Sequence, residues 1–245
     1  MTWLCCSTER GTDGERTMTE EELLERVDRI RRELAEASDG RYPAPKLIAV
    51  TKTHPPEMIL PLKAAGITDI GENRVQELRE KLPQLAGSFR IHLIGRLQRN
   101  KVRQIVQDVC MIQSVDSLPL AEEIHSRAAA AGIRMPVLAE VSPAGEAQKG
   151  GIPIRETEQF LRQIAPLEGI QVQGLMAVMP LTEDTDLLDR LFSGMRELFE
   201  HIRETDIPGI RMEELSMGMS GDYRIAARHG ATMVRVGSAI FGPRG

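Results

Sequence analysis

The chain has 245 residues, of which 41% are hydrophobic and 27% are charged, and its formal net charge is −5. This composition is typical of a globular protein and excludes a disordered or collagen-like chain. The acidic balance argues against a protein that binds nucleic acid through a general positive field, and no apolar run approaches the length of a membrane span. We therefore expect a cytoplasmic monomer that binds neither nucleic acid nor membranes.

The first folded element is expected shortly after the start of the chain. Residues 1–18 are polar and show no periodic pattern, so we expect a flexible leader there. Thr19 and Glu22 have the spacing of a capping box, which predicts a helix from Thr19 to about Gly40. Its apolar stripe consists of Leu23, Val27, Ile30 and Leu34. We expect a single folded domain over residues 19–245.

Strand-like apolar runs then alternate with amphipathic segments, without a linker or a change in composition. The clearest helical segments are residues 118–131 and 187–202. Eight strand-like runs are found, at residues 47–51, 67–70, 89–94, 109–115, 137–141, 172–178, 214–217 and 233–236.

This alternation predicts an α/β protein. Parallel strands need crossover connections, and eight such units close into a TIM-type (β/α)8 barrel, here with one extra helix at the N-terminus. An open doubly wound sheet is the alternative. The absence of a GxGxxG motif after the first strand argues against a dinucleotide-binding sheet of that kind.

A barrel brings the carboxyl ends of its strands together at one mouth, where barrel enzymes place their chemistry. Lys52 follows the first apolar run directly and is the most conspicuous residue there. By itself, a lysine at this position is also explained by a side chain that extends from the strand end into water. The other strand-end residues are Glu72, Asn73, His92, Gly95, Ser114, Asp116, Glu140, Ser142, Met176, Ser216, Ser220, Arg235, Gly237 and Ser238.

The last two runs lead into a candidate anion site. Gly218 and Gly221 permit a close approach of the backbone to a ligand, and Ser220 is placed to cap a helix that begins at Asp222. Barrels commonly bind phosphate in the loops after strands seven and eight. A serine-glycine turn without a ligand explains this stretch equally well.

Together with Lys52 across the barrel mouth, such a site suggests a phosphorylated aldehyde or ketone held as a Schiff base. The lysine amine must be neutral to condense, which burial and a nearby cation such as Arg235 favour. Pyridoxal phosphate and a sugar phosphate both satisfy this description.

Several motifs resemble those of a known family. They are AVTKTHP, IGENRVQE, HLIGRLQRNK, GLMAV, LSMGMSGD and VRVGSAIFG. The chain resembles the pyridoxal phosphate homeostasis proteins, which are single-barrel relatives of the N-terminal domain of alanine racemase. The resemblance extends from about Leu23 to the C-terminus, and it implies that Lys52 carries pyridoxal 5'-phosphate as an internal aldimine.

The resemblance also implies roles for six other residues. The phosphate would be bound by Ser220, Gly237 and Ser238, with Ser216 close by. Arg235 would face the pyridine nitrogen, and Asn73 would line the pocket near the ring. Arg74 occupies a position where the family usually carries an aromatic residue.

Arg235 bears on the chemistry as well as on binding. A permanently charged guanidinium beside the pyridine nitrogen discourages protonation of the ring, which makes the cofactor a poor electron sink. The alternative role for Arg235 is a structural salt bridge with Glu140 or Asp116.

Other polar residues have structural interpretations that we favour. His92 lies in an apolar run without partners at metal-ligand spacing, so we expect a hydrogen-bonded core histidine. Lys149 either assists cofactor exchange or flanks a flexible loop, and we favour the loop. A basic cluster is expected to be a solvated helix face and consists of Arg96, Arg99, Lys101 and Arg103.

Two classes of function remain open. The favoured one is a binding protein that stores, protects or delivers pyridoxal phosphate, possible recipients being apoenzymes that depend on this cofactor. The alternative is a Schiff-base enzyme, either an amino-acid racemase or a sugar-phosphate aldolase. Racemisation needs proton donors on both faces of the substrate, usually with a second domain, and neither Tyr42 nor Tyr223 is an obvious second base.

Overall fold

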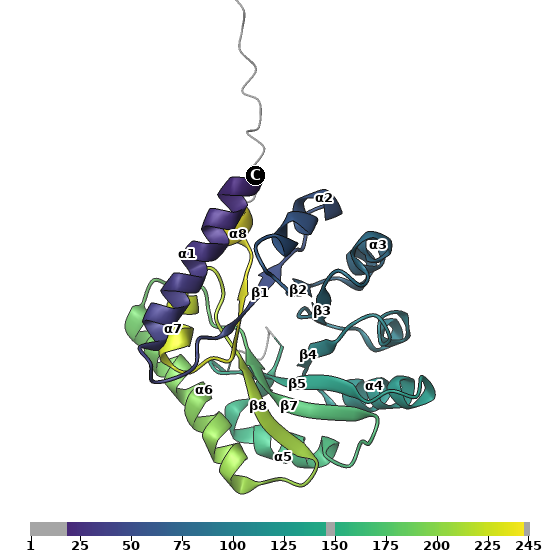
Figure 1. Ribbon diagram of the computed structural model, residues 1–245. Helices are drawn as coiled ribbons and strands as arrows, with labels where there is room; N and C mark the ends of the chain where they lie inside the picture. The colour runs from purple at the N-terminus through teal and green to yellow at the C-terminus, as the bar shows by residue number, and fades with distance from the viewer. Residues whose placement is uncertain (1–18, 146–149, 243–245) are drawn as a thin grey trace, which may run out of the picture.

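The structure, a computed structural model, describes residues 19–145 and 150–242. The leader expected over residues 1–18 and the loop residue Lys149 lie outside these ranges. Figure 1 shows a barrel of parallel strands surrounded by helices. No helix in the described ranges combines the length and the apolar character that a bilayer crossing requires.

Eight strands form the closed barrel, in the order β4-β3-β2-β1-β9-β8-β7-β5, and the pairing of β4 with β5 completes the circle. The predicted (β/α)8 barrel is therefore confirmed. The eight strands are β1 (Lys46–Val50), β2 (Asp69–Glu72), β3 (Arg90–Leu93), β4 (Met111–Val115), β5 (Met135–Ser142), β7 (Ile170–Ala177), β8 (Ile210–Ser216) and β9 (Met233–Val236). A short β6 (Ile152–Pro153) pairs with the end of β5.

Each of the eight predicted runs overlaps a strand, and the largest difference in bounds is at the start of β8. β8 begins at Ile210, four residues before the predicted run. The prediction missed the first half of the strand because Arg211 and Glu213 there are exposed charged residues. Alternating exposed charges hide this part of the strand from a search for apolar runs.

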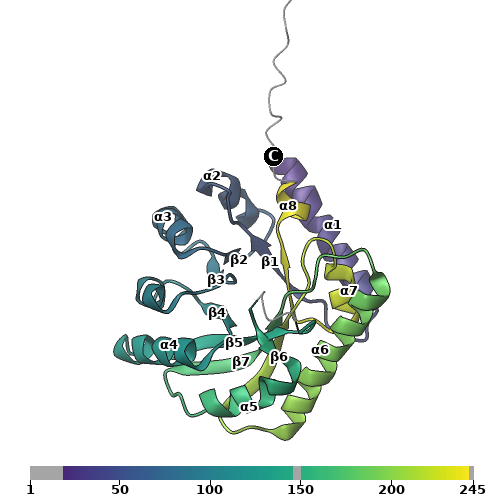
Figure 2. The same cartoon turned by 180° about the vertical axis from the view of Figure 1, so that it is seen from behind.

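Helices and helical turns make up the outer layer. They are α1 (Glu20–Ser38), α2 (Pro56–Ile59), η1 (Leu60–Lys63), α3 (Val75–Leu85), η2 (Arg99–Gln104), α4 (Leu118–Ala130), α5 (Ile154–Ile164), α6 (Thr185–Thr205), α7 (Tyr223–Arg228) and α8 (Ser238–Phe241). The capping box at the start of α1 is present as predicted, and the helix is extra to the barrel. Its Arg26 donates a hydrogen bond to the Ile240 carbonyl in α8 at 3.1 Å. Seen from behind, α1 again lies beside α7 and α8 (Figure 2).

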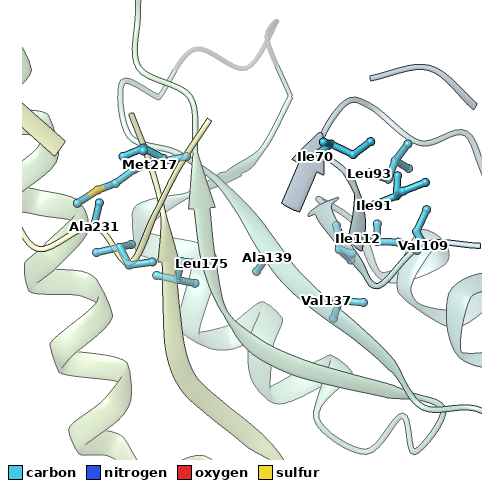
Figure 3. Close-up of a cluster of buried hydrophobic side chains, with 14 of the residues drawn as sticks. Ile70, Ile91, Leu93, Val109, Ile112, Val137, Ala139, Leu175, Met217 and Ala231 are labelled. Carbon is cyan, nitrogen blue, oxygen red and sulfur yellow. The ribbon is translucent and has the colours of Figure 1, made fainter. Parts of the chain in front are cut away.

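The core has two parts because successive strand residues face opposite sides. Outward-facing side chains pack against the helices, and Figure 3 shows Ile70, Ile91 and Ile112 among them. A smaller apolar cluster also contains strand residues, among them Ile48, Leu138 and Met176. Ile48 lies between Leu47 and Ala49, which belong to the larger cluster, so the smaller cluster fills the barrel interior.

Candidate functional site

Lys52 lies two residues after the end of β1, at the carboxyl end of the barrel, as the sequence predicts. Its residue is half-buried, and the next residue, Thr53, has a left-handed backbone with φ of 69°. A β-branched residue rarely adopts this conformation, so the surrounding structure must hold the turn in place.

A buried lysine holds that turn from both sides. The Lys81 ammonium group donates to the Thr51 carbonyl at 2.7 Å and to Glu77 Oε1 at 2.6 Å. Glu77 in turn accepts a hydrogen bond from the Thr53 backbone N–H. The backbone on each side of Lys52 is therefore tied to α3, which fixes the point from which the Lys52 side chain starts.

Glu72 completes this buried cluster. Its Oε1 accepts from Lys81 at 2.8 Å and from the Thr51 hydroxyl at 2.6 Å, and its side chain is fully buried. Burial raises the pKa of Glu72, and the Lys81 and Thr51 hydrogen bonds oppose that rise. Sequence reasoning placed Glu72 at the strand end but missed Lys81, because a lysine on an amphipathic helix is expected to face solvent.

Asn73 follows β2 at the neighbouring strand end. Its residue is half-buried, yet its side-chain Oδ1 is buried without a hydrogen-bond partner in the described structure. Gly95 allows the backbone of Asn73 to pass close by, because a Cβ on residue 95 would lie 2.4 Å from the Asn73 carbonyl oxygen. An unpartnered buried acceptor is costly, and a ligand with a donor would satisfy it.

The structure corrects the role predicted for Ser220. Its Oγ accepts hydrogen bonds from the backbone N–H groups of Gly237 at 3.1 Å and Ala239 at 3.3 Å. Ser220 thus ties the β8–α7 loop to the start of α8, whereas the sequence suggested a cap on the helix after Asp222. That helix, α7, has Asp222 as its N-cap, with the Asp222 carboxylate accepting from the Met219 N–H at 2.5 Å.

The two glycines of this loop differ in their roles. Gly218 has φ of 95°, and a Cβ there would lie 2.5 Å from the Ala226 Cβ of α7. Gly221 is exposed, and a Cβ there would meet nothing within 4 Å. Gly218 is therefore required for packing of the loop against α7. The sequence analysis expected this glycine to allow the approach of a ligand and did not predict its packing role.

Lys52 and the anion loop lie side by side, not across the mouth as the sequence analysis expected. β1 and β9 are paired neighbours, with Ala49 opposite Val236. A Cβ on Gly237 would lie 3.3 Å from the Val50 Cβ, which is two residues before Lys52. Closure of the barrel brings its first and last strands together, so the two features share one edge of the mouth.

Arg235 projects into the barrel interior and is buried. One guanidinium nitrogen donates to Ser216 Oγ and the other to the Ala177 carbonyl, each at 2.7 Å. Burial lowers the pKa of Arg235 to about 10, against the opposing effects of Glu140 and Asp222, so the side chain stays cationic at neutral pH. No ion pair joins Arg235 to a carboxylate in the described ranges, so the salt bridge considered as its alternative role is not formed with Glu140 or Asp116.

A chain of buried hydrogen bonds continues from Arg235 through the barrel. Ser216 Oγ donates to Gln113 Oε1 at 2.7 Å, and Gln113 Nε2 lies 3.1 Å from His92 Nδ1. His92 Nε2 lies 2.9 Å from Asp69 Oδ1. Burial alone would raise the pKa of Asp69, but hydrogen bonds from His92 and Thr68 lower it to about 2.

This chain confirms the prediction that His92 is a hydrogen-bonded core residue. In residues 19–145 and 150–242, no group of three or more potential metal ligands is placed to hold an ion. Gln113 was not singled out from sequence, although a glutamine inside the apolar run MIQSV is a signal that could have identified an interior polar residue.

Glu140 lies near the end of β5, close enough to Arg235 and Asp116 to interact with both charges. Burial raises the pKa of Glu140 to about 7, and Asp116 contributes to this rise, while Arg235 and Arg96 oppose it. The mouth therefore contains a carboxyl group that titrates near neutral pH.

Both tyrosines of the chain are engaged outside the mouth. The Tyr223 hydroxyl donates to Glu33 on α1, and the Tyr42 ring lies under the Arg196 guanidinium at 4.7 Å. Burial and the neighbouring Glu33 carboxylate raise the pKa of Tyr223.

Comparison with known proteins identifies the class of the barrel. The sequence model of the family "Alanine racemase, N-terminal domain" matches residues 22–245. Solved alanine racemases share the fold, such as that of Clostridium difficile, which is 18% identical with a TM-score of 0.72 and is covered over 57% of its length. The chain thus belongs to the class of proteins built on the alanine racemase N-terminal barrel.

Closer relatives define the family within that class. The pyridoxal phosphate homeostasis protein of Aquifex aeolicus is 37% identical over 91% of this chain and 97% of its own. The human pyridoxal phosphate homeostasis protein is 35% identical over 82% and 77% of the two chains. The structure of PipY of Synechococcus elongatus with PLP bound is 34% identical and has a TM-score of 0.80, covering 90% of this chain and all of that one. This chain belongs to the pyridoxal phosphate homeostasis protein family.

Proposed function

We propose that the chain binds pyridoxal 5'-phosphate covalently through Lys52 and serves pyridoxal phosphate homeostasis by storing, protecting or delivering the cofactor. The observation that carries this proposal is the shared position of Lys52 and the Ser220 loop at one edge of the barrel mouth. The names of the relatives and the PLP-bound structure of PipY support the same ligand.

The described residues fit such a ligand. Ser220 Oγ accepts two backbone N–H groups, and its own hydroxyl hydrogen remains available to donate to a phosphate oxygen. Gly237 and Ser238 form the start of α8, with Ser238 exposed. The unpartnered Oδ1 of Asn73 can accept a hydrogen bond from the ligand.

Arg235 and Ser216 support the ring from within the barrel. Their mutual hydrogen bond of 2.7 Å, with a second bond to the Ala177 carbonyl, fixes a buried cation at the carboxyl ends of β7 and β8. A bound pyridoxal group supplies an electron-withdrawing ring, and a cation next to its nitrogen disfavours protonation there. Arg235 thus favours retention of the cofactor over chemistry on a substrate.

The proposal also covers the partners of the protein and its location in the cell. We propose that recipient apoenzymes are the partners and that the protein acts as a cytoplasmic monomer. The proposal includes no catalytic turnover, because both tyrosines are engaged with Glu33 and Arg196.

The test replaces Lys52 with alanine. The wild-type protein, incubated with pyridoxal 5'-phosphate, should show an absorbance band that borohydride reduction fixes to the chain, and peptide mapping should place the adduct on Lys52. Lys52→Ala should lose the band and remain folded, because Lys52 is a half-buried strand-end residue. Lys63→Ala, which removes an exposed lysine from η1, is the matched control. A reducible adduct of undiminished stoichiometry on another lysine in the Lys52→Ala protein would overturn the assignment.

A further inference from the structure

A basic groove opens beside the barrel mouth, away from the Ser220 loop. It has a volume of about 910 Å³ and is formed by the segments that follow β2, β3 and β4. Four cationic side chains line it: Arg74, Arg96, Arg99 and Lys101. Among the described residues, Asp116 is the only carboxylate in the lining. We call this feature the basic groove.

Carboxylates of the protein neutralise the cations of the basic groove only weakly, and Arg96 acts on Glu140 without a close ion pair. Within residues 19–145 and 150–242, none of the four forms an ion pair. Exposed arginines on other helices do so, as Arg155 pairs with Glu156 at 3.3 Å and Arg162 pairs with Glu158 at 2.8 Å. In a chain of net charge −5, this concentrates positive potential at one side of the mouth.

Backbone groups add to the positive potential. α3 and α4 both begin at the basic groove, and neither Arg74 nor Ser117, their N-cap residues, makes a side-chain capping hydrogen bond. Uncapped helix N-termini carry partial positive charge. The groove therefore offers hydrogen-bond donors as well as charged side chains to an acidic ligand.

The shape of the basic groove favours an extended chain. A second hollow, of about 400 Å³, continues between α3 and η2 and shares Gln76 and Lys101 with the groove. Its other lining residues are Arg79, Glu80 and Gln104. A small anion needs only one compact site. The two joined hollows instead form a continuous path from the mouth to the outer face, which suits an extended polypeptide segment.

The lining also distinguishes a polypeptide from a nucleic acid. Buried apolar residues, Val75, Leu97 and Leu120, contribute to the walls, which suits apolar side chains between acidic ones. No aromatic residue is among the lining residues of either hollow in the described structure. Proteins that bind single strands usually provide aromatic rings on which bases stack.

We infer that the basic groove docks an extended acidic segment of a partner polypeptide at the barrel mouth. This differs from the expectation that the basic cluster is only a solvated helix face. The groove shares Asn73 with the proposed cofactor site, so a docked partner would lie next to that site. The inference deepens the proposed function by giving the partner a chemistry, but docking requires only charges and shape that exist without cofactor.

The test measures binding of a fluorescent peptide of about a dozen residues, with glutamate alternating with leucine or alanine, to the full chain without cofactor. Fluorescence anisotropy should show saturable binding that weakens as salt is added. The peptide with lysine in place of glutamate should not bind. Arg96→Glu and Arg99→Glu should each weaken binding at least tenfold. Arg155→Glu makes the same charge change on α5 and should have less than a twofold effect.

Several outcomes would overturn the inference. These are no saturable binding, binding that survives both groove substitutions, or an equal loss in Arg155→Glu. Complete displacement by inorganic pyrophosphate at the peptide's own concentration would indicate a small-anion site. Tighter binding of a single-stranded RNA of similar length, lost in the groove variants, would indicate a nucleic-acid site. Borohydride trapping on Lys52 tests the proposed function separately, so either result can fail without the other.

Discussion

At the scale of single residues, the candidate site depends on side chains that hold other groups in place. Lys81 fastens the turn that carries Lys52, and Ser220 fastens the loop that carries Gly237. Both act through hydrogen bonds to backbone atoms, which restrict the positions of the residues nearby. These hydrogen bonds are present without a ligand, so Lys81 and Ser220 position the site before any ligand binds.

Ser220 gives the first prediction at this scale. Ser220→Ala should weaken binding of pyridoxal 5'-phosphate roughly tenfold to hundredfold, because a hydrogen bond to a charged ligand contributes about 1.5–3 kcal/mol. Pyridoxal without its phosphate should bind the variant and the wild type equally. Titrations with both ligands at fixed ionic strength measure the difference. A similar loss for both would assign Ser220 to loop structure alone, consistent with its bonds to Gly237 and Ala239.

Glu140 gives a prediction about pH. Its pKa of about 7 exceeds the ordinary value of 4.5, so the folded chain binds this proton more tightly than the unfolded chain. The associated stability is fully present below about pH 4.5 and is lost as the pH rises through about 7. Glu140→Gln keeps a neutral side chain at all pH values. Its advantage over the wild type should grow over this interval to on the order of 1–3 kcal/mol.

Urea unfolding of the protein without cofactor at several pH values between 4 and 8 measures that difference. Glu156→Gln is the control, because Glu156 is an exposed carboxylate on α5. A Glu140→Gln advantage that is the same at every pH would contradict the proposed titration.

At the scale of elements, the segments after the strands are less regular than their apolar patterns suggest. The connection after β3 forms the 3-10 helix η2 instead of an α-helix, and the one after β1 is divided into α2 and η1. Pro55, Pro56 and Pro61 lie in that second connection, and a proline removes a backbone donor and restricts its predecessor. Because α2, η1 and η2 are short, loops make up much of the connections after β1 and β3 at the mouth.

The loop after β8 gives the prediction at this scale. Gly218→Ala should destabilise the fold by about 2 kcal/mol or more, since it places a side chain at φ of 95° and a Cβ 2.5 Å from Ala226. Gly221→Ala in the same loop should change stability by less than about 0.5 kcal/mol, because its Cβ meets open space. Chemical denaturation of both variants tests the pair, and equal effects would refute the difference in their roles.

At the scale of the whole molecule, the barrel has the fold of alanine racemases, and both of its tyrosines are engaged with other residues of the chain. Tyr223 lies one turn from the anion loop in sequence, but its hydroxyl is bound to Glu33 on α1. A racemase needs donors on both faces of the substrate carbon.

We therefore expect cofactor-loaded protein to convert L-alanine to D-alanine no faster than a Lys52→Ala control. Chiral chromatography of reaction mixtures measures the D-isomer. Turnover above the control that is lost in Tyr223→Phe would reverse the conclusion and restore the racemase alternative.

The sequence by itself determined the barrel and many of its candidate residues. Eight short apolar runs separated by helical segments have few ways to bury both faces of a parallel sheet, so the closed barrel could be predicted. Lys52 and Arg235 could be placed near the mouth for the same reason, because strand ends converge. The capping box at Thr19 is a local pattern and was read correctly for that reason.

Only the tertiary structure decided which of these residues meet. The closure of the barrel places Lys52 beside the Gly237 loop, and Ser220 finds its partners 17 and 19 residues further along the chain. The spacing of Lys81 from Leu78 and Leu85 places it on the buried face of α3, but only the tertiary structure shows that Glu72 and the Thr51 carbonyl surround its amine. Hydrogen bonds and charges act over a few ångströms in space, whereas a sequence pattern records only spacing along the chain.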